Sequence, residues 1–159
     1  MCLTLVVKVF SRRATESDCE VLELLEIEAR TNFALFRGGL RLASDLKVVG
    51  ENWFTQVADT KTIVFVGGTS QTVLGYLLAR IGLSSLGKIA TIEQVFVTRD
   101  ARNMGIGDAL VSSIIDWAKS QSFVALDALA LPGDRETKNL FERSGLVARL
   151  IVATTDLSN

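Results

Sequence analysis

The residues best suited to chemistry are two closely spaced glycines that follow a run rich in Val and Phe. The segment at 97–110 reads VTRDARNMGIGDAL, with Gly105 and Gly107 where a helix is predicted to begin. Glycine permits positive φ and lets a ligand approach the backbone closely. The first N–H groups of a helix have no partner within it, and the helix dipole favours negative charge there. Such a loop between a strand and a helix is suited to hold a pyrophosphate group.

The spacing of these residues separates the loop from two common nucleotide-binding motifs. A P-loop requires Gly-Lys-Ser/Thr after four intervening residues, which this segment lacks. A Rossmann fingerprint requires a third small residue at position 110, where this chain has Leu110, and it usually lies in the first strand–helix unit. The pattern that remains is Arg-x-x-Gly-x-Gly, formed by Arg102, Gly105 and Gly107.

The composition favours a single domain over residues 1–159 and excludes several kinds of catalytic site. The chain has 159 residues, of which 48% are hydrophobic and 22% are charged, enough for a substantial core. It has no histidine, which excludes a Ser-His-Asp triad, a Cys-His pair and an HExxH zinc site. The sequence also has no hard-ion carboxylate cluster and no Cys/His ligand set, so no metal is expected.

Cysteine content, charge and hydropathy indicate where the protein is expected to work. Cys2 and Cys19 are too few for a four-thiolate zinc site or a disulfide framework, which favours a reducing compartment. The 17 basic and 18 acidic side chains give a net charge of −1, which indicates neither nucleic acid nor an anionic membrane as a partner. The N-terminal MCLTLVVKVF has no basic region and is too short to span a bilayer. We therefore expect a cytoplasmic protein, with monomer and homodimer both open.

Hydrophobic periodicity predicts the elements that must position the loop. Helices are expected from Ser17 to Arg30 with Ser17 and Glu20 as a capping box, on either side of Gly50, from 106 to 119, and from the N-cap Asp134 to Gly145. Strands are expected at 4–12, 62–67, 72–81, 88–97, 123–130 and 146–155. This order predicts an α/β domain, and hairpins in the first half make its sheet mixed.

The pattern of Arg102, Gly105 and Gly107 resembles the acyl-CoA-binding loop of the GCN5-related N-acetyltransferase (GNAT) family. The strand IEQVFV with TRDARNMGIGDAL is similar to the family's central strand and pyrophosphate loop, GYLLARI to the preceding strand, and KNLFERSGLVAR to the last helix and turn. The resemblance spans nearly the whole chain. It implies a mixed, mostly antiparallel central sheet flanked by helices, with a splayed central strand pair.

The resemblance also implies how acetyl-CoA, the co-substrate, would be bound. Backbone amides of the loop would hold the pyrophosphate, Arg102 would add positive charge, and backbone groups of Val95 and Val97 would pair with the pantetheine amides. The co-substrate-binding residues expected on this basis are Val95, Phe96, Val97, Arg102, Asn103, Met104, Gly105, Ile106, Gly107, Asp108 and Phe141.

Glu93 is the expected catalytic residue. A lysine-like amine has a pKa of about 10.4, so a general base assists acyl transfer at neutral pH. Glu93 lies within the apolar strand KIATIEQVFV, where a charge is costly unless it is used or paired, and it matches a position where many family members carry a catalytic Glu. The alternative is that Glu93 pairs with a neighbouring arginine or caps a loop. Gln94 is interpreted as a structural hydrogen-bonding residue.

Phe141 marks a departure from the family pattern. It occupies the place of a tyrosine that protonates the departing CoA thiolate in the family, and the only tyrosine of this chain is Tyr76. Asp134 similarly replaces the family's Asn near the start of the same helix. Water or Ser144 is a candidate replacement for the acid, whose loss can cost roughly 10²–10⁴-fold in rate.

Residues 31–60 fall where the family builds its acceptor pocket. They contain Phe33, Phe36, Trp53 and Phe54, and Arg30, Arg37 and Arg41 lie in or beside them. Two interpretations stay open: an aromatic pocket wall with arginines that meet a carboxylate, or core aromatics with a solvated basic face.

We therefore expect an acetyl-CoA-dependent N-acetyltransferase that moves an acetyl group directly to a primary amine in a ternary complex. The amine belongs to a small molecule, a protein N-terminus or a lysine. The alternatives are a non-catalytic acyl-CoA-binding module that regulates a partner, and a nucleotide-binding protein.

Overall fold

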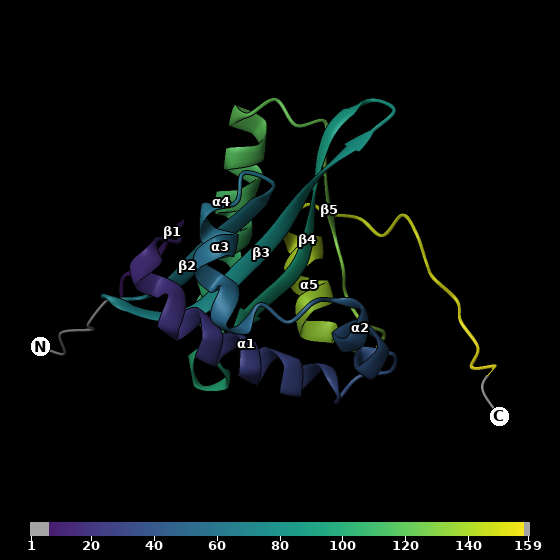
Figure 1. The fold of residues 1–159 in the computed structure, drawn as a ribbon, viewed down its shortest axis with the longest axis horizontal. Coiled ribbons are helices and arrows are strands. Elements are labelled where there is room, and N and C mark those ends of the chain that lie inside the picture. The colour runs from purple at the N-terminus through teal and green to yellow at the C-terminus, as the bar shows by residue number, and fades with distance from the viewer. Residues whose placement is uncertain (1–6, 158–159) are drawn as a thin grey trace, which may run out of the picture.

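The fold is seen in a computed structural model that describes residues 7–157 (Figure 1). Its strands are β1 (Val9–Arg13), β2 (Thr62–Thr69), β3 (Thr72–Ser84), β4 (Gly87–Val97) and β5 (Ala125–Ala128). Its α-helices are α1 (Cys19–Phe33), α2 (Gly39–Asp45), α3 (Trp53–Ala58), α4 (Ile106–Ser120) and α5 (Arg135–Arg143), and short 3₁₀ turns cover Glu16–Asp18, Gly50–Asn52 and Arg99–Ala101. Within 7–157, none of the helices is long and apolar enough to cross a bilayer.

The strands form one sheet in the order β1-β2-β3-β4-β5. The first four are antiparallel neighbours, and β5 joins β4 in parallel. The expectation of a mixed, mostly antiparallel sheet flanked by helices is therefore confirmed. The parallel pair needs a crossover connection, and α4 supplies it.

Helices cover the sheet on both faces, with α1 and α3 on one face and α4 and α5 on the other (Figure 1). The α4 side is a core of Ile, Leu, Val and Ala side chains into which Leu140 and Phe141 of α5 also pack. The α1 side is a separate core that contains Leu22, Trp53 and Tyr76. The site described below lies where both cores meet the end of β4.

A β-bulge in β4 changes which side chains face which core. Leu78 of β3 is opposite Gln94, whereas Ala79 is opposite Ile92, so Glu93 is an extra residue. Before the bulge, Ile92 packs in the α4-side core, and after it Phe96 packs in the α1-side core. Two consecutive side chains, Glu93 and Gln94, thus lie on the α1 side, and the bulge also bends the strand.

The central strand pair splays as the family resemblance implied. The ladder between β4 and β5 runs from Ile89 opposite Ala125 to Ile92 opposite Ala128, and one further bond joins the Leu129 N–H to the Ile92 carbonyl. Beyond it, β4 continues to Val97 while β5 has ended. The last five residues of β4 therefore have no strand beside them on that edge within the described part of the chain.

Three sequence expectations are corrected by the structure. The first helix is capped two residues earlier, because Asp18 accepts hydrogen bonds from the Thr15 N–H and hydroxyl at 2.8 and 3.1 Å, in place of Ser17 with Glu20. The fifth strand spans 125–128 and not 123–130.

The expected last strand at 146–155 is absent: 146–157 forms neither helix nor strand, and it is almost wholly exposed and runs away from the sheet (Figure 1). Its β-branched residues suit a strand, but a strand also needs a neighbouring edge to pair with. Of the first predicted strand, residues 4–6 lie outside the described residues.

Candidate active site

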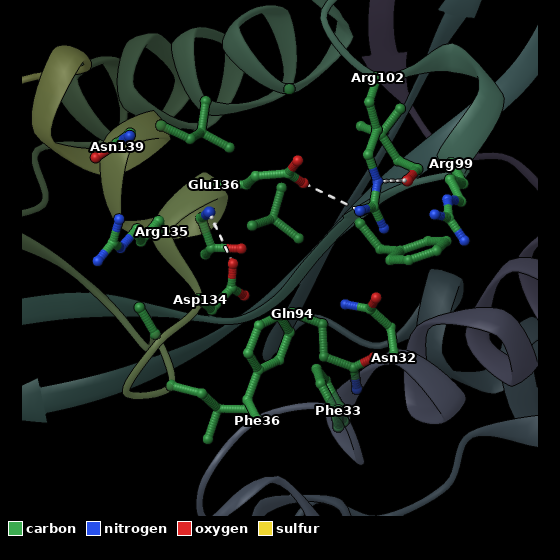
Figure 2. Close-up of a pocket in the computed structure, with 18 of the residues that line it drawn as sticks. Asn32, Phe33, Phe36, Gln94, Arg99, Arg102, Asp134, Arg135, Glu136 and Asn139 are labelled. Atoms are coloured by element: carbon green, nitrogen blue, oxygen red, sulfur yellow. Dashed lines mark hydrogen bonds and ion pairs between the residues drawn. The ribbon is translucent and has the colours of Figure 1, made fainter.

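A pocket of about 980 Å³ opens where β4 and β5 part. Four segments line it: the end of α1 with the residues after it, the second half of β4, the loop into α4, and the chain from Leu129 to Arg143. Figure 2 shows side chains from these segments converging, with Asn32, Phe33, Phe36 and Gln94 at one end and Arg135, Glu136 and Asn139 on the α5 side. The described residues contain no group of three or more His, Cys, Asp or Glu side chains placed to hold a metal ion.

The glycine-bearing loop forms a concave run of backbone at the start of α4. Asn103 and Gly105 both have left-handed backbone conformations, with φ of 62° and 87°. Successive backbone N–H groups in such a turn form an anion-binding nest. A Cβ placed on Gly105 would meet nothing within 4 Å, so the space beside it is open to a ligand. The role of this loop as a phosphate site stays a prediction, and the open space beside Gly105 is compatible with it.

Glycine is needed at position 107 for a different reason. A Cβ at this position would lie 3.2 Å from Cδ2 of Leu140 on α5. Glycine here allows the first turn of α4 to pack closely against α5. The sequence interpretation treated both glycines as making room for phosphate. The structure gives that reason to Gly105 alone, because the space beside Gly107 is taken by Leu140.

Arg102 lines the pocket and makes three contacts there. Its Nε donates to the Val97 carbonyl at 3.2 Å, its Nη1 pairs with Glu136 at 3.0 Å, and its guanidinium lies 5.7 Å from the centre of the Phe96 ring. The Val97 carbonyl, expected to meet a pantetheine amide, thus has an internal partner here. Figure 2 shows the Arg102–Glu136 pair joining the two sides of the pocket.

Glu93 is one of the pocket-lining residues, but it is also paired. Its Oε2 accepts a hydrogen bond from Nε of Arg80 at 3.1 Å, and its side chain is about one-quarter exposed, at 24%. Arg80 is held in turn by Gln56 and Thr62, at 2.5 and 2.7 Å. The ion pair was one of the two interpretations of Glu93. It fixes the carboxylate at the pocket wall, and Oε1 accepts no hydrogen bond from the described residues.

A second carboxylate ties α1 to the loop that follows β4. Both oxygens of Glu28 accept from the Thr98 hydroxyl, at 3.1 and 2.9 Å, and Oε1 also accepts from the Arg99 N–H at 3.3 Å. This contact sets the distance between the end of α1 and the pocket. Sequence reasoning did not select Glu28, because a carboxylate on a helix surface has no local signal for a partner 70 residues away.

A largely buried ion pair, Glu26 with Arg30, lies on the inner side of α1. The Glu26 carboxylate accepts from the N–H groups of Val49 and Gly50 at 2.9 and 2.8 Å and from the Trp53 indole at 3.2 Å. Arg30, 3.9 Å from Glu26, donates to the carbonyls of Ala43 and Leu46. Because a buried unpaired charge is costly, the pair fixes the segment between α2 and α3 onto α1.

The aromatic residues of 31–60 fit two interpretations made from the sequence: some form a wall of the pocket, and others do not reach it. Phe33 and Phe36 line the pocket, whereas Trp53 is a buried core residue and Phe54 is exposed away from the pocket. Arg30 serves the buried ion pair, and Arg41 pairs with Asp45 and donates to Thr154. None of the three arginines is among the residues that line the pocket.

Phe141 lies in the α4-side core and is not among the pocket-lining residues. One helical turn before Phe141, Thr137 lines the pocket, and Ser144, the candidate replacement for the acid, donates its hydroxyl to the Leu140 carbonyl at 2.8 Å. Asp134 is the N-cap of α5, accepting from the Thr137 N–H at 3.0 Å, as the sequence predicted. The expectation that Phe141 contacts the co-substrate stays a prediction, without a pocket contact to support it.

Most of the other expected co-substrate residues do line the pocket. They are Val95, Phe96, Val97, Asn103, Ile106 and Asp108. Met104 is exposed and is not among them. Asp108 pairs with Arg143 of α5, and the hydrogen bond from that guanidinium lowers the pKa of Asp108. This pair joins α4 to α5, whereas the Arg102–Glu136 pair joins the loop before α4 to α5.

Residues 13–146 match the model of the acetyltransferase (GNAT) family. The chain therefore belongs to the GNAT family, and it is an N-acetyltransferase by class. A search of curated protein sequences gave no significant match.

Solved structures share the fold at low sequence identity. The chain is similar to a ribosomal-protein-alanine N-acetyltransferase from Brucella melitensis biovar Abortus 2308, with 15% identity, 94% of this chain and 100% of that chain covered, and a TM-score of 0.69. It is also similar to the aminoglycoside acetyltransferase meta-AAC0020 from an uncultured soil metagenomic sample, with 14% identity, 95% and 96% coverage, and a TM-score of 0.70. AAC(6')-Iy in complex with the bisubstrate analogue CoA-S-monomethyl-acetylneamine matches with 13% identity, 94% and 99% coverage, and a TM-score of 0.67.

Proposed function

We propose that this protein transfers an acetyl group from acetyl-CoA to a primary amine, directly and within a ternary complex. The observation that carries the proposal is the pocket between the parted ends of β4 and β5, with a backbone nest at one end and a carboxylate, Glu93, on its wall. One end suits an anionic, extended co-substrate, and the other suits a cationic amine.

The residues present fit acetyl-CoA. The nest at Asn103–Gly105 offers N–H groups at the N-terminus of α4, and the open space beside Gly105 admits a pyrophosphate. The edge of β4 from 93 to 97 has no strand beside it in the described part of the chain. Apart from the Val97 carbonyl, which accepts from Arg102, its backbone groups on that side are left to an extended amide-containing arm. When bound, acetyl-CoA supplies an acetyl group activated as a thioester.

The chain's own residues then prepare the acceptor. Glu93 is positioned to take a proton from the incoming ammonium, directly or through a water molecule, because its Oε1 is free while Oε2 is held by Arg80. Phe33 and Phe36 exclude water beside it and offer apolar contact to the acceptor's carbon skeleton. Positioning and desolvation of the amine are the main contributions that this site can make.

Among residues 7–157, none of the candidate side-chain acids is placed to protonate the departing thiolate. Phe141 is in the core, Ser144 is committed to the Leu140 carbonyl, and Tyr76 is buried and does not line the pocket. A thiol with a pKa of about 8.5 is a competent leaving group without help, so turnover is expected to be slower than with a well-placed acid.

The binding module stays the second candidate, and one observation favours it. The Arg102–Glu136 pair joins the two sides of the pocket and occupies a carbonyl that the co-substrate would use. A protein that only senses acyl-CoA could use such a pair as the contact that ligand binding breaks.

The deciding experiment measures CoA release from acetyl-CoA with a thiol reagent, across a broad panel of primary amines. Calorimetry on the same preparation measures acetyl-CoA affinity. Binding together with amine-dependent thiol release is the result we expect. Binding without turnover on any amine would favour the module, and stabilisation by ATP or NAD but not by acetyl-CoA would indicate a nucleotide-binding protein.

A further inference from the structure

Gln94 carries a buried amide nitrogen that the protein itself leaves unpaired. The residue is 3% exposed, and its Oε1 accepts a hydrogen bond from the Tyr76 hydroxyl at 2.5 Å. Its Nε2 has no hydrogen-bond partner among the described residues. A buried donor without a partner costs about 1–3 kcal/mol, so most such groups in native proteins are satisfied. An orphan donor beside a pocket is therefore informative.

The position of the orphan donor follows from the bulge. Because Glu93 and Gln94 lie on the same side of β4, the candidate base and the amide both border the α1 end of the pocket. Figure 2 shows the Gln94 side chain at the same end of the pocket as Asn32 and Phe33. Phe33 is half-buried at the last position of α1 and lines the pocket there.

The orientation of the amide is fixed from behind by Tyr76. The Tyr76 ring is fully buried, with the Trp53 ring edge-on at 5.6 Å and the Phe96 ring at 6.5 Å. Burial raises the pKa of Tyr76, so the phenol stays protonated and remains a donor. Since the hydroxyl donates to Oε1, the NH₂ group of Gln94 is turned toward the remaining side. Tyr76 thus acts as a positioning residue, although it does not line the pocket.

We propose that Gln94 is a specificity-determining residue of the acceptor subsite, and that its Nε2 donates a hydrogen bond to an uncharged oxygen near the reacting amino group. This inference rests on the proposed function. The acceptor class is then a primary amine with a nearby hydroxyl, ether or amide oxygen. A carboxylate is disfavoured at that place, because Glu93 and Glu28 both line the same pocket.

The test compares acceptors within one protein sample. Primary amines with an ether oxygen two or three atoms from the amino nitrogen are paired with all-carbon amines of the same length, and kcat/KM is measured by thiol release from acetyl-CoA. We expect wild type to prefer the oxygen-bearing amine of at least one pair by about threefold to tenfold, the usual value of one hydrogen bond. The ratio is independent of the fraction of folded protein.

Two variants test whether Gln94 and Tyr76 cause the preference for oxygen-bearing amines. Gln94→Met keeps the length and removes the donor, and it should bring the ratio close to one. Tyr76→Phe leaves Gln94 in place but frees its amide to turn, and it should lower the ratio while the KM for acetyl-CoA stays unchanged. As a control, Gln121→Met changes an exposed amide just after α4, outside the pocket lining, and should leave the ratio as in wild type.

Equal use of paired amines by wild type, or an undiminished preference in Gln94→Met, would overturn the inference while the acetyltransferase activity stands. Absence of thiol release with every amine would instead overturn the proposed function, and the inference with it.

Discussion

Arg102 and Glu136 form an ion pair that joins the loop before α4 to the first turn of α5, with Nη1 and Oε2 3.0 Å apart. Both residues line the pocket. Glu136 thus pairs with the arginine of the expected phosphate-binding loop and adds negative charge there. A ligand with a pyrophosphate group must compete with this carboxylate for Arg102.

Removing the carboxylate should therefore strengthen CoA binding. Exposed ion pairs contribute about 0–1 kcal/mol, so we expect Glu136→Gln to raise the affinity for CoA up to about fivefold at low salt. The matched control is Glu142→Gln, which breaks the Lys138–Glu142 pair on the same helix, away from the pocket. Calorimetry at two salt concentrations makes the measurement. Weaker binding in Glu136→Gln would mean that the pair organises the site for the ligand.

The two loop glycines should respond differently to substitution. Gly105→Val forces a β-branched residue into a left-handed conformation and fills the open space of the nest, so CoA affinity should fall below detection in a protein that still folds. Gly107→Val instead pushes against Leu140 and should lower the melting temperature. Calorimetry and thermal unfolding on both variants separate the effects. Wild-type CoA affinity in Gly105→Val would remove the phosphate assignment of the loop.

Glu93→Gln tests the candidate base. If Glu93 takes the proton, turnover should fall and recover partly at high pH, where the amine deprotonates unaided. The pH–rate profile with one simple amine is the measurement, and the acetyl-CoA affinity serves as a check on folding. A profile equal to wild type would assign Glu93 to the ion pair with Arg80 alone.

Phe141→Tyr tests the departure from the family pattern. Since Phe141 is 6% exposed within the α4-side core, we expect the added hydroxyl to be buried without a partner and to cost about 1–3 kcal/mol of stability, with turnover unchanged. Thiol release and melting temperature are measured on the same sample. A gain in rate would instead place the sulfur near residue 141 and restore the acid position.

The Arg12–Asp18 pair should make stability depend on acid pH. The hydrogen bond from Arg12 lowers the pKa of Asp18, and Asp18 also accepts from Thr15. A carboxylate with a depressed folded-state pKa stabilises the fold fully above its unfolded value of about 3.9, and this contribution is lost as pH falls through the folded pKa. Asp18→Asn should therefore lower the melting temperature at pH 7, and the difference from wild type should shrink in acid.

The control for that experiment is Asp127→Asn. Asp127 has the same kind of arginine partner, but Arg149 lies in the exposed segment after α5 and its side chain is 69% exposed. Exposed pairs of this kind contribute little to stability. A difference for Asp18→Asn that stays constant from pH 7 to pH 3 would mean that the charge of Asp18 does not stabilise the fold.

Local pattern predicted the parts of the site that local chemistry determines. The loop from Arg102 to Gly107 and the N-cap Asp134 follow from residues a few positions apart, and the structure has both as expected. The order of elements likewise follows from periodicity. These features depend on backbone conformation within one turn of chain, which the sequence determines directly.

Features that depend on long-range pairing could not be predicted. The Glu93–Arg80 pair was one of two interpretations, because it requires knowing which strand lies beside β4. The bulge has no signal in the alternating segment KIATIEQVFV, since it exists only relative to β3. The prediction of a strand at 146–155 was wrong for the same reason: its residues favour a strand, but in the structure they pair with no strand, and the segment contacts β5 through the Arg149–Asp127 side-chain pair.

The arrangement of side chains at the site depends on the one extra residue in β4 as well as on the residue types. A regular strand offers every second side chain to one face, whereas this strand offers Glu93 and Gln94 in succession. Deleting residue 93 would leave Leu78 opposite Gln94 and Ala79 opposite Ile92 in an unbroken ladder, without moving any later side chain to the other face. Without the extra residue, the strand would present Gln94 to the α1 side of the pocket with no carboxylate next to it.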